Sequence, residues 1–134
     1  MTDGLKLETK VIRRFIIKTK QDRYIGFISD KKNRSKFTNS LAHFSRDLNK
    51  DLFEEIKGDE RQVIRERLKS LGKINDCYLI SESNYLDQKR FDVETALIET
   101  IGHGMGTLIV FGDARLVYYE AEGPKDRWIS KILD

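Results

Sequence analysis

The sequence predicts an α+β fold: a helical N-terminal half followed by a three-stranded, mostly antiparallel sheet with one inserted helix and one C-terminal helix. Apolar residues before Gly72 recur at helical spacing. Continuous apolar runs of strand length follow Gly72, and Gly112-Asp113 joins two of these runs as a hairpin turn does. A length of 134 residues fits a single domain, 1–134, that buries a core without help from a metal or a disulfide.

Four helical segments are expected in the N-terminal half. The first spans residues 7–18 and the second, or a bent continuation of the first, spans residues 23–30, with a strand left open as an alternative because both contain β-branched residues. Asp30 is expected to cap the third helix, and Asp59 the fourth, which ends at Gly72. The apolar stripe of the third helix consists of Phe37, Leu41, Phe44 and Leu48.

Three strands and two helices are expected after Gly72. The strands lie within residues 76–81, 106–112 and 114–122. Asp92 caps the inserted helix and Gly102 stops it. Pro124 takes the first position of the C-terminal helix. The buried side of that last helix is expected to be Trp128, Ile129, Ile132 and Leu133.

The predicted sheet is apolar on both faces. Leu108 and Val110 point to one side of their strand, while Ile109 and Phe111 point to the other. Both faces therefore need a cover. The N-terminal helices must also bury apolar residues of their own, so we expect a second copy of the chain to cover what is left and the protein to be a homodimer.

The composition excludes several classes of protein. The longest apolar runs have strand length, so no membrane contact is expected, and residues 1–10 lack the apolar segment of a secretory leader. Cys77 has no second cysteine to pair with, which makes the cytoplasm the expected compartment. One Cys and two His are too few for the usual structural zinc site, and we expect neither a metal nor a cofactor.

Three alternating glycines, Gly102, Gly104 and Gly106, raise the question of a phosphate-binding loop. Phosphate loops lead from a strand into a helix N-terminus, where free N–H groups and the helix dipole meet the anion. Here the glycines follow a helix, and their spacing matches neither the dinucleotide fingerprint nor the P-loop. We therefore expect Gly102 to be the helix stop and the rest to be a turn, with no cap requirement on Gly104.

An enzymatic interpretation of the same region stays open as an alternative. The C-terminus of a helix stabilises a protonated imidazole, which would make His103 a usable acid or base. Glu82 and Glu120 are the carboxylates considered as its partners in a small hydrolase or nuclease-like enzyme. Cys77 lies within an apolar strand, where a free cysteine is usually a small hydrophobe.

The distribution of charge is the strongest functional signal. The net charge of +3 conceals a basic segment, residues 1–50, with 13 Lys or Arg against 5 Asp or Glu, and an acidic α+β segment, residues 51–134, with 12 against 17. Clustered cations neutralise phosphates. Interleaved aromatic side chains can stack on bases, although helical spacing places all of these aromatic side chains except Tyr24 in the core. The candidate anion-binding residues are Arg13, Arg14, Lys18, Lys20, Arg23, Lys31, Lys32, Arg34 and Lys36.

The leading functional hypothesis is therefore a small, non-enzymatic binding or regulatory module. Its basic N-terminal half is expected to contact an anionic partner, either nucleic acid or an acidic protein surface. No helix-turn-helix, RRM or KH signature is present in the sequence. A third hypothesis is a structural subunit of a larger assembly.

Overall fold

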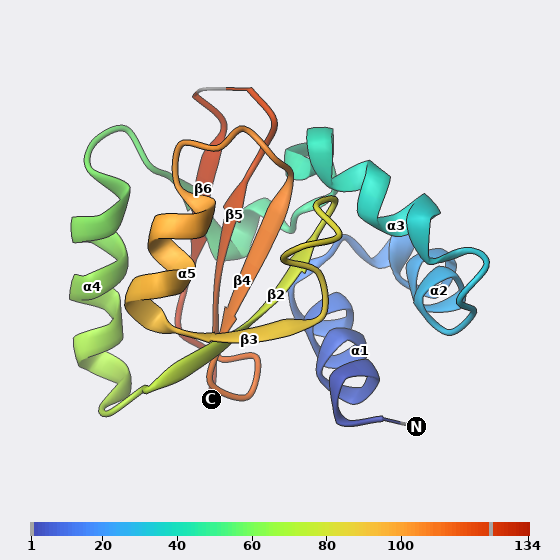
Figure 1. The fold of residues 1–134 in the computed structure, drawn as a ribbon, viewed down its shortest axis with the longest axis horizontal. Helices are drawn as coiled ribbons and strands as arrows, with labels where there is room; N and C mark the ends of the chain where they lie inside the picture. The colour runs from blue at the N-terminus through green and yellow to red at the C-terminus, as the bar shows by residue number, and fades with distance from the viewer. Residues whose placement is uncertain (1, 124) are drawn as a thin grey trace.

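The computed structural model describes residues 2–123 and 125–134, and over these it has five α-helices, two 3₁₀ helices and a six-stranded antiparallel sheet (Figure 1). The helices are α1 (Asp3–Phe15), α2 (Lys18–Ile28), α3 (Arg34–Ser40), η1 (Leu41–Asp47), η2 (Lys50–Leu52), α4 (Glu60–Leu71) and α5 (Val93–Thr100). The strands are β1 (Phe53–Glu55), β2 (Asp76–Ser81), β3 (Lys89–Asp92), β4 (Thr107–Phe111), β5 (Leu116–Glu120) and β6 (Arg127–Ser130). The α+β class and the helical N-terminal half agree with the sequence-based expectation, whereas the sheet does not.

The expectation of a three-stranded sheet is wrong, because the strand order is β1-β6-β5-β4-β2-β3. The three strands expected from apolar runs exist as β2, β4 and β5, and they form its centre together with β6. Two of the three additional strands, β1 and β3, are short and mostly polar: Phe53–Glu55 reads FEE and Lys89–Asp92 reads KRFD. Their extended conformation depends on pairing with a neighbouring strand, and periodicity in the chain does not reveal it.

The expected C-terminal helix is also wrong. Pro124, its proposed first residue, lies outside the described residues, and Arg127–Ser130 forms β6, which pairs with β5 on one side and β1 on the other. Ile129 is fully buried, while Trp128 is half-buried. Two adjacent apolar residues fit a strand between two neighbours as well as they fit a helix.

The remaining elements largely follow their local signals. Asp59 caps α4 by accepting hydrogen bonds from Arg61 N and Gln62 N, as expected. Asp92 caps α5 in the same way through Thr95 N. Asp30 does not cap α3, because the residue before that helix is Asn33.

The apolar stripe expected on the third helix is buried, although the helix changes type within it. Phe37, Leu41, Phe44 and Leu48 are at most 1% exposed. The α-helix ends at Ser40 and continues as η1, in which His43 has non-helical backbone angles. The stripe therefore predicts the buried face correctly but not the geometry of the helix.

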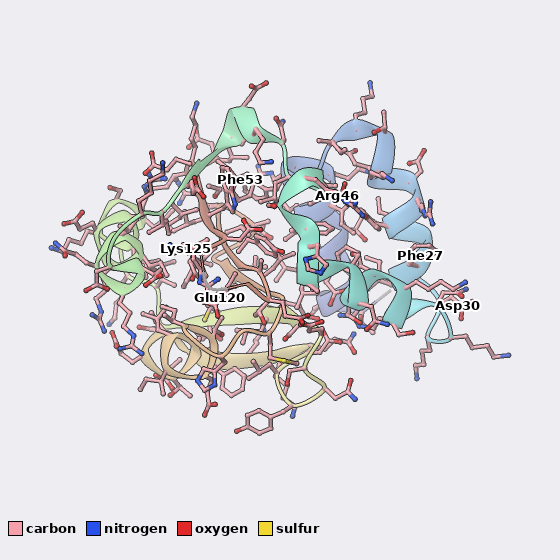
Figure 2. All side chains as sticks on the ribbon, turned by 90° about the horizontal axis from the view of Figure 1, so that it is seen from above. Phe27, Asp30, Arg46, Phe53, Glu120 and Lys125 are labelled. Carbon is pink, nitrogen blue, oxygen red and sulfur yellow. The ribbon has the colours of Figure 1, made fainter. Side chains whose placement is uncertain are left out.

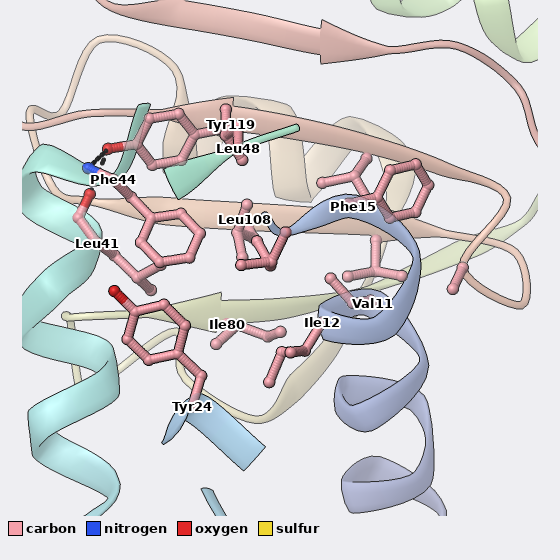
Figure 3. Close-up of a cluster of buried hydrophobic side chains, with 14 of the residues drawn as sticks. Val11, Ile12, Phe15, Tyr24, Leu41, Phe44, Leu48, Ile80, Leu108 and Tyr119 are labelled. Atoms are coloured by element: carbon pink, nitrogen blue, oxygen red, sulfur yellow. Dashed lines mark hydrogen bonds between the residues drawn. The ribbon is translucent and has the colours of Figure 1, made fainter. Parts of the chain in front are cut away.

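Helices cover both faces of the sheet (Figure 1). The N-terminal helices pack on the face that carries Tyr78, Leu108 and Val110 (Figure 3). On the opposite face, α4 and α5 pack over Ile109 and Phe111. The alternation predicted for β4 is confirmed. Since both faces are covered within one chain, an uncovered apolar face no longer supports a homodimer.

Tyr119 ties the N-terminal helices to the centre of the sheet (Figure 3). Its hydroxyl accepts a hydrogen bond from Phe44 N at 2.7 Å and donates one to Leu41 O. Burial raises the pKa of this phenol, so the hydroxyl keeps the proton that it donates.

Candidate functional site

Most of the exposed cations of the N-terminal half lie on α2, on α3 and on the turn between them. Figure 2 shows Phe27 and Asp30 of this region at one end of the molecule, well away from Glu120 and Lys125. Residues 18–40 carry seven Lys or Arg against two Asp, which gives this pair of helices a strong positive charge. We call it the α2–α3 surface, and its cations are Lys18, Lys20, Arg23, Lys31, Lys32 and Lys36.

Arg34, a predicted member of this group, points into the protein instead. Its guanidinium makes two hydrogen bonds to Glu8, at 2.6 and 2.9 Å, and two to Asp87, both at 2.9 Å. Tyr78 donates to the same Glu8 carboxylate, which is fully buried. Burial alone would lower the pKa of Arg34, but the hydrogen bonds to Asp87 and Glu8 outweigh it and raise the pKa. Arg34 joins α1, α3 and the β2–β3 connection, and four of its five N–H donors are used by these two carboxylates.

Two other predicted cations are also engaged within the chain. Arg14 donates to Ala114 O at 2.9 Å and to the carbonyl oxygen of Asp134, so it binds the C-terminal segment. Arg13 lies 3.0 Å from Asp22 in an exposed ion pair, which contributes little and is easily exchanged. The structure therefore places six of the nine predicted residues on the α2–α3 surface, whereas Arg13, Arg14 and Arg34 are engaged elsewhere within the chain.

The N-terminus of α2 differs from those of α1, α4 and α5. Side chains of Thr2, Asp59 and Asp92 cap those three helices, and each has an acidic residue in its first turn. The first turn of α2 has no side-chain cap and no acid but contains Lys18 and Lys20. Unpaired N–H groups and the helix dipole at such an end favour an anion.

Arg46 joins this surface, and sequence reasoning missed it. Ile17 N donates to Asp47 O at 2.9 Å, and Asn49 N donates to Phe15 O at 2.8 Å, so the two segments run antiparallel. The pairing is a single bridge between Ile16 and Leu48, and it holds the end of η1, with exposed Arg46 (Figure 2), against α2, where Tyr24 donates to Asp47. No local pattern in the sequence indicates this pairing, because it depends on a contact between segments about 30 residues apart.

The accessible aromatic side chain on the α2–α3 surface is Phe27, and not Tyr24 as expected. Tyr24 is buried and donates to Asp47, and burial together with this carboxylate raises the pKa of Tyr24 to about 12. Phe27 is half-buried, with the Arg23 guanidinium 5.4 Å and the Lys36 ammonium 5.7 Å from its ring centre. Both cations lie at cation–π distance, so they are held on the outer side of the helices.

The three alternating glycines have a structural explanation. Gly102 and Gly104 have φ angles of 87° and 68°, which favour glycine, so Gly104 is also conformationally required. A Cβ on Gly106 would lie 2.3 Å from the Leu41 carbonyl carbon and 2.5 Å from Ala42 N. The loop therefore turns after α5 and lets β4 begin directly against the backbone of η1.

The polar side chains proposed for catalysis hold this loop in place. Glu82 accepts a hydrogen bond from Gly106 N at 2.8 Å, and Glu120 accepts from Gly102 N at 3.2 Å. The His103 ring lies 2.8 Å from Ile98 O, at the end of its own helix. Among the described residues, no hydrogen bond or ion pair joins His103 to Glu82 or Glu120.

Glu120 has the most perturbed chemistry of the three. Burial raises its pKa, which the nearby Arg127 guanidinium partly offsets. Arg127 Nε lies 3.1 Å from Glu120 Oε1, although the two groups are not aligned as a hydrogen bond. Tyr118 donates to the same oxygen at 3.0 Å. A raised pKa is typical of a general acid, but the Glu120 side chain is fully buried, so a substrate has no access to it.

Cys77 does not form part of a nucleophilic pair. It is 1% exposed in β2, and burial together with Asp76 and Asp92 raises the pKa of its thiol to about 12. Reactive cysteines have lowered pKa values and solvent access. Cys77 is therefore a small apolar residue of the core.

Within residues 2–123 and 125–134, no three His, Cys, Asp or Glu side chains are grouped as ligands of a metal ion. Of the helices in the same residues, none has both the length and the apolarity needed to cross a bilayer. No family model, curated protein or solved structure matches the chain.

Proposed function

We propose that this chain is a non-enzymatic binding module that uses the α2–α3 surface and Arg46 to contact the phosphate backbone of a nucleic acid. One observation carries the proposal. Seven exposed or half-exposed cations lie on α2, on α3, on the turn between them and on η1, and within the described part of the chain none of the seven forms an ion pair. Cations that are not neutralised within the fold are available to neutralise phosphates.

The uncapped start of α2 supports the same ligand chemistry. Its N–H groups would add to the charge of Lys18 at a phosphate, and Lys20 and Arg46 add further positive charge to this part of the surface. Ser35, exposed beside Lys36 on α3, offers a neutral donor for a second phosphate contact. Contacts of this type depend little on base sequence, so we propose binding without strong sequence preference.

An acidic protein surface is the alternative partner. It would use the same cations, but carboxylates are spaced irregularly, and binding would depend on one particular partner. An enzymatic role at the glycine loop receives less support, since Glu82 and Glu120 accept hydrogen bonds from the loop backbone. We also propose a cytoplasmic location, on the ground that the only cysteine is a buried thiol; cell fractionation with an antibody tests it.

The test compares two triple variants of equal net charge. In the first, Lys31, Lys32 and Lys36 are changed to Ala; in the second, Lys57, Lys69 and Lys73 on the other half of the chain are changed to Ala. All six are exposed, so both variants should fold. We expect the first variant to bind a fluorescent oligonucleotide at least about 10-fold more weakly at low salt, and the second to bind like the wild type.

The controls separate the alternatives. If the wild type binds neither single-stranded nor duplex oligonucleotides at low salt, nucleic acid is not the partner. An acidic protein that co-purifies at low salt and is lost from the first variant alone would support the alternative partner. Equal losses in both variants would show that only total charge matters and would remove the α2–α3 surface from the proposal.

A further inference from the structure

The strand β3 is an open edge of the sheet. In the described residues it pairs with β2 alone, and β1 forms the other edge. Lys89, Arg90 and Asp92 are exposed, and Phe91 is half-buried. Tyr85, whose ring centre lies 6.5 Å from that of Phe91, is 60% exposed. Apolar surface therefore accompanies the unpaired backbone of this edge.

The hydrogen-bond alternation of the sheet fixes which groups of β3 point outward. Glu82 N donates to Gly106 O across the β2–β4 ladder. The backbone N–H and C=O groups of even-numbered β2 residues therefore point to β4, and those of odd-numbered residues point to β3. Cys77, opposite Phe91, is odd-numbered, which leaves Arg90 to direct its N–H and C=O away from the sheet. Asp92 directs its N–H outward in the same way, while its C=O begins the hydrogen bonding of α5.

The charges of β3 in one copy are complementary to those of β3 in a second copy. Antiparallel pairing of two identical strands has its two-fold axis perpendicular to the sheet, so paired residues must point to the same face. The axis must therefore lie midway between the two copies of one residue, which are paired with each other. An axis through Arg90 would place two guanidinium groups opposite each other. An axis through Phe91 pairs Arg90 of each copy with Asp92 of the other and places the two Phe91 rings together.

The other edge of the sheet lacks this property. Two copies of β1 would place Glu54 or Glu55 opposite its own copy when the axis lies at either residue. Arg67 of α4 also covers this edge by donating to Glu54. Charged edge strands normally prevent pairing with arbitrary partners, and only on β3 do the signs favour a second copy of the same strand.

We propose that two copies of this chain associate through β3, in the antiparallel register centred on Phe91. Each copy donates Asp92 N–H to Arg90 C=O of the other and places its Arg90 side chain beside the carboxylate of Asp92 of the other copy. Tyr85 extends the contact between the two Phe91 rings. The contact is small, so the dimer is weak and forms at about 100 µM or above.

Disulfide trapping tests the register. Phe91→Cys is placed in a Cys77→Ala background, because Cys77 lies opposite Phe91 within the same chain. In the proposed register the two Cα atoms at position 91 are about 4.5 Å apart, within disulfide range. The matched control is Lys89→Cys in the same background. In the proposed register the two Cα atoms at position 89 would be ~13 Å apart along the strand direction.

We expect Phe91→Cys to form an interchain disulfide at least about 10-fold faster than Lys89→Cys under the same mild oxidant. Equal rates, or a faster rate for Lys89→Cys, would overturn the proposed register. Sedimentation equilibrium of the otherwise unaltered protein provides a second test if Phe91→Cys folds poorly. Arg90→Glu should abolish the dimer, whereas Lys73→Glu, the same charge change at another exposed site, should leave it intact. A wild type that stays monomeric at a few hundred µM would overturn the proposal.

Discussion

Replacing each glycine of the 102–106 loop by alanine tests whether the loop has a structural role. At Gly106 the added methyl group would meet backbone atoms of η1, the Leu41 carbonyl oxygen at 2.4 Å and Ala42 N at 2.5 Å. Relief requires a movement of about 1 Å, because carbon atoms in contact lie roughly 3.5 Å from their neighbours. The same η1 segment accepts hydrogen bonds from Tyr119 and Glu122, so it resists that movement.

The magnitudes follow from the two kinds of conflict. Overpacking costs typically 1–3 kcal/mol, and a rigid backbone obstacle places Gly106→Ala near about 3 kcal/mol. Gly102→Ala meets open space but strains a φ of 87°, which costs about 1 kcal/mol. Gly104→Ala combines a φ of 68° with a contact of 3.2 Å to Glu122 O, so we expect about 1–2 kcal/mol. With an unfolding entropy of about 2.1 cal/mol/K per residue, 3 kcal/mol lowers Tm by about 10 °C and 1 kcal/mol by about 4 °C.

Thermal unfolding followed by circular dichroism measures this series, and Gly26→Ala is the control. Gly26 lies within α2 with no atom within 4 Å of its added Cβ, so this change should raise Tm by about 3 °C through helix propensity. From highest to lowest Tm, the expected order is Gly26→Ala, wild type, Gly102→Ala, Gly104→Ala and Gly106→Ala. A Gly106→Ala protein that melts within about 2 °C of the wild type would refute the close approach of β4 to η1.

Three further predictions concern individual side chains. Arg34→Ala should lower the free energy of unfolding by about 3–5 kcal/mol in urea titrations, because it leaves Glu8 buried without its cation; a loss below about 1 kcal/mol would mean that Arg34 is solvated. Cys77, whose pKa is raised to about 12, should stay a thiol and react with a thiol reagent at pH 8 only at the rate of unfolding; fast labelling would contradict its burial. The pKa of Tyr24 is also raised to about 12, so the neutral phenol stabilises the fold. This stabilisation is complete below the ordinary phenol pKa near 10 and is lost as the pH rises through about 12. An absorbance titration of the wild type against Tyr24→Phe measures the ionisation, and ionisation of Tyr24 near pH 10 would contradict the prediction.

The central strands and the caps of α4 and α5 were predictable because their signals are local. The apolar run of Thr107–Phe111 fits a buried strand, and Asp59 and Asp92 cap helices through N–H groups two or three residues away. The edge strands were not predictable, because FEE and KRFD contain neither an apolar run nor an alternation. They are strands because a neighbouring strand offers them hydrogen bonds.

The candidate surface was predictable in composition but not in membership. Lys31, Lys32 and Arg34 look alike in the sequence, yet Arg34 is drawn inward by Glu8 and Asp87. These carboxylates lie 26 and 53 residues away along the chain. Arg46 was missed for the same reason, since its place beside α2 depends on backbone pairing between distant segments. Charge follows from the sequence alone, whereas the availability of a charge depends on tertiary contacts.

The salt dependence of oligonucleotide binding tests the proposed nucleic-acid contact most directly. The logarithm of the association constant for a duplex should fall linearly with the logarithm of salt concentration, with a slope of about −0.9 for each phosphate neutralised. Changing Lys31, Lys32 and Lys36 to Ala should reduce the steepness of that slope by up to about 2.7, and changing Lys57, Lys69 and Lys73 should leave it unchanged. A slope near zero for the wild type, or the same slope in all three proteins, would contradict binding through the α2–α3 surface.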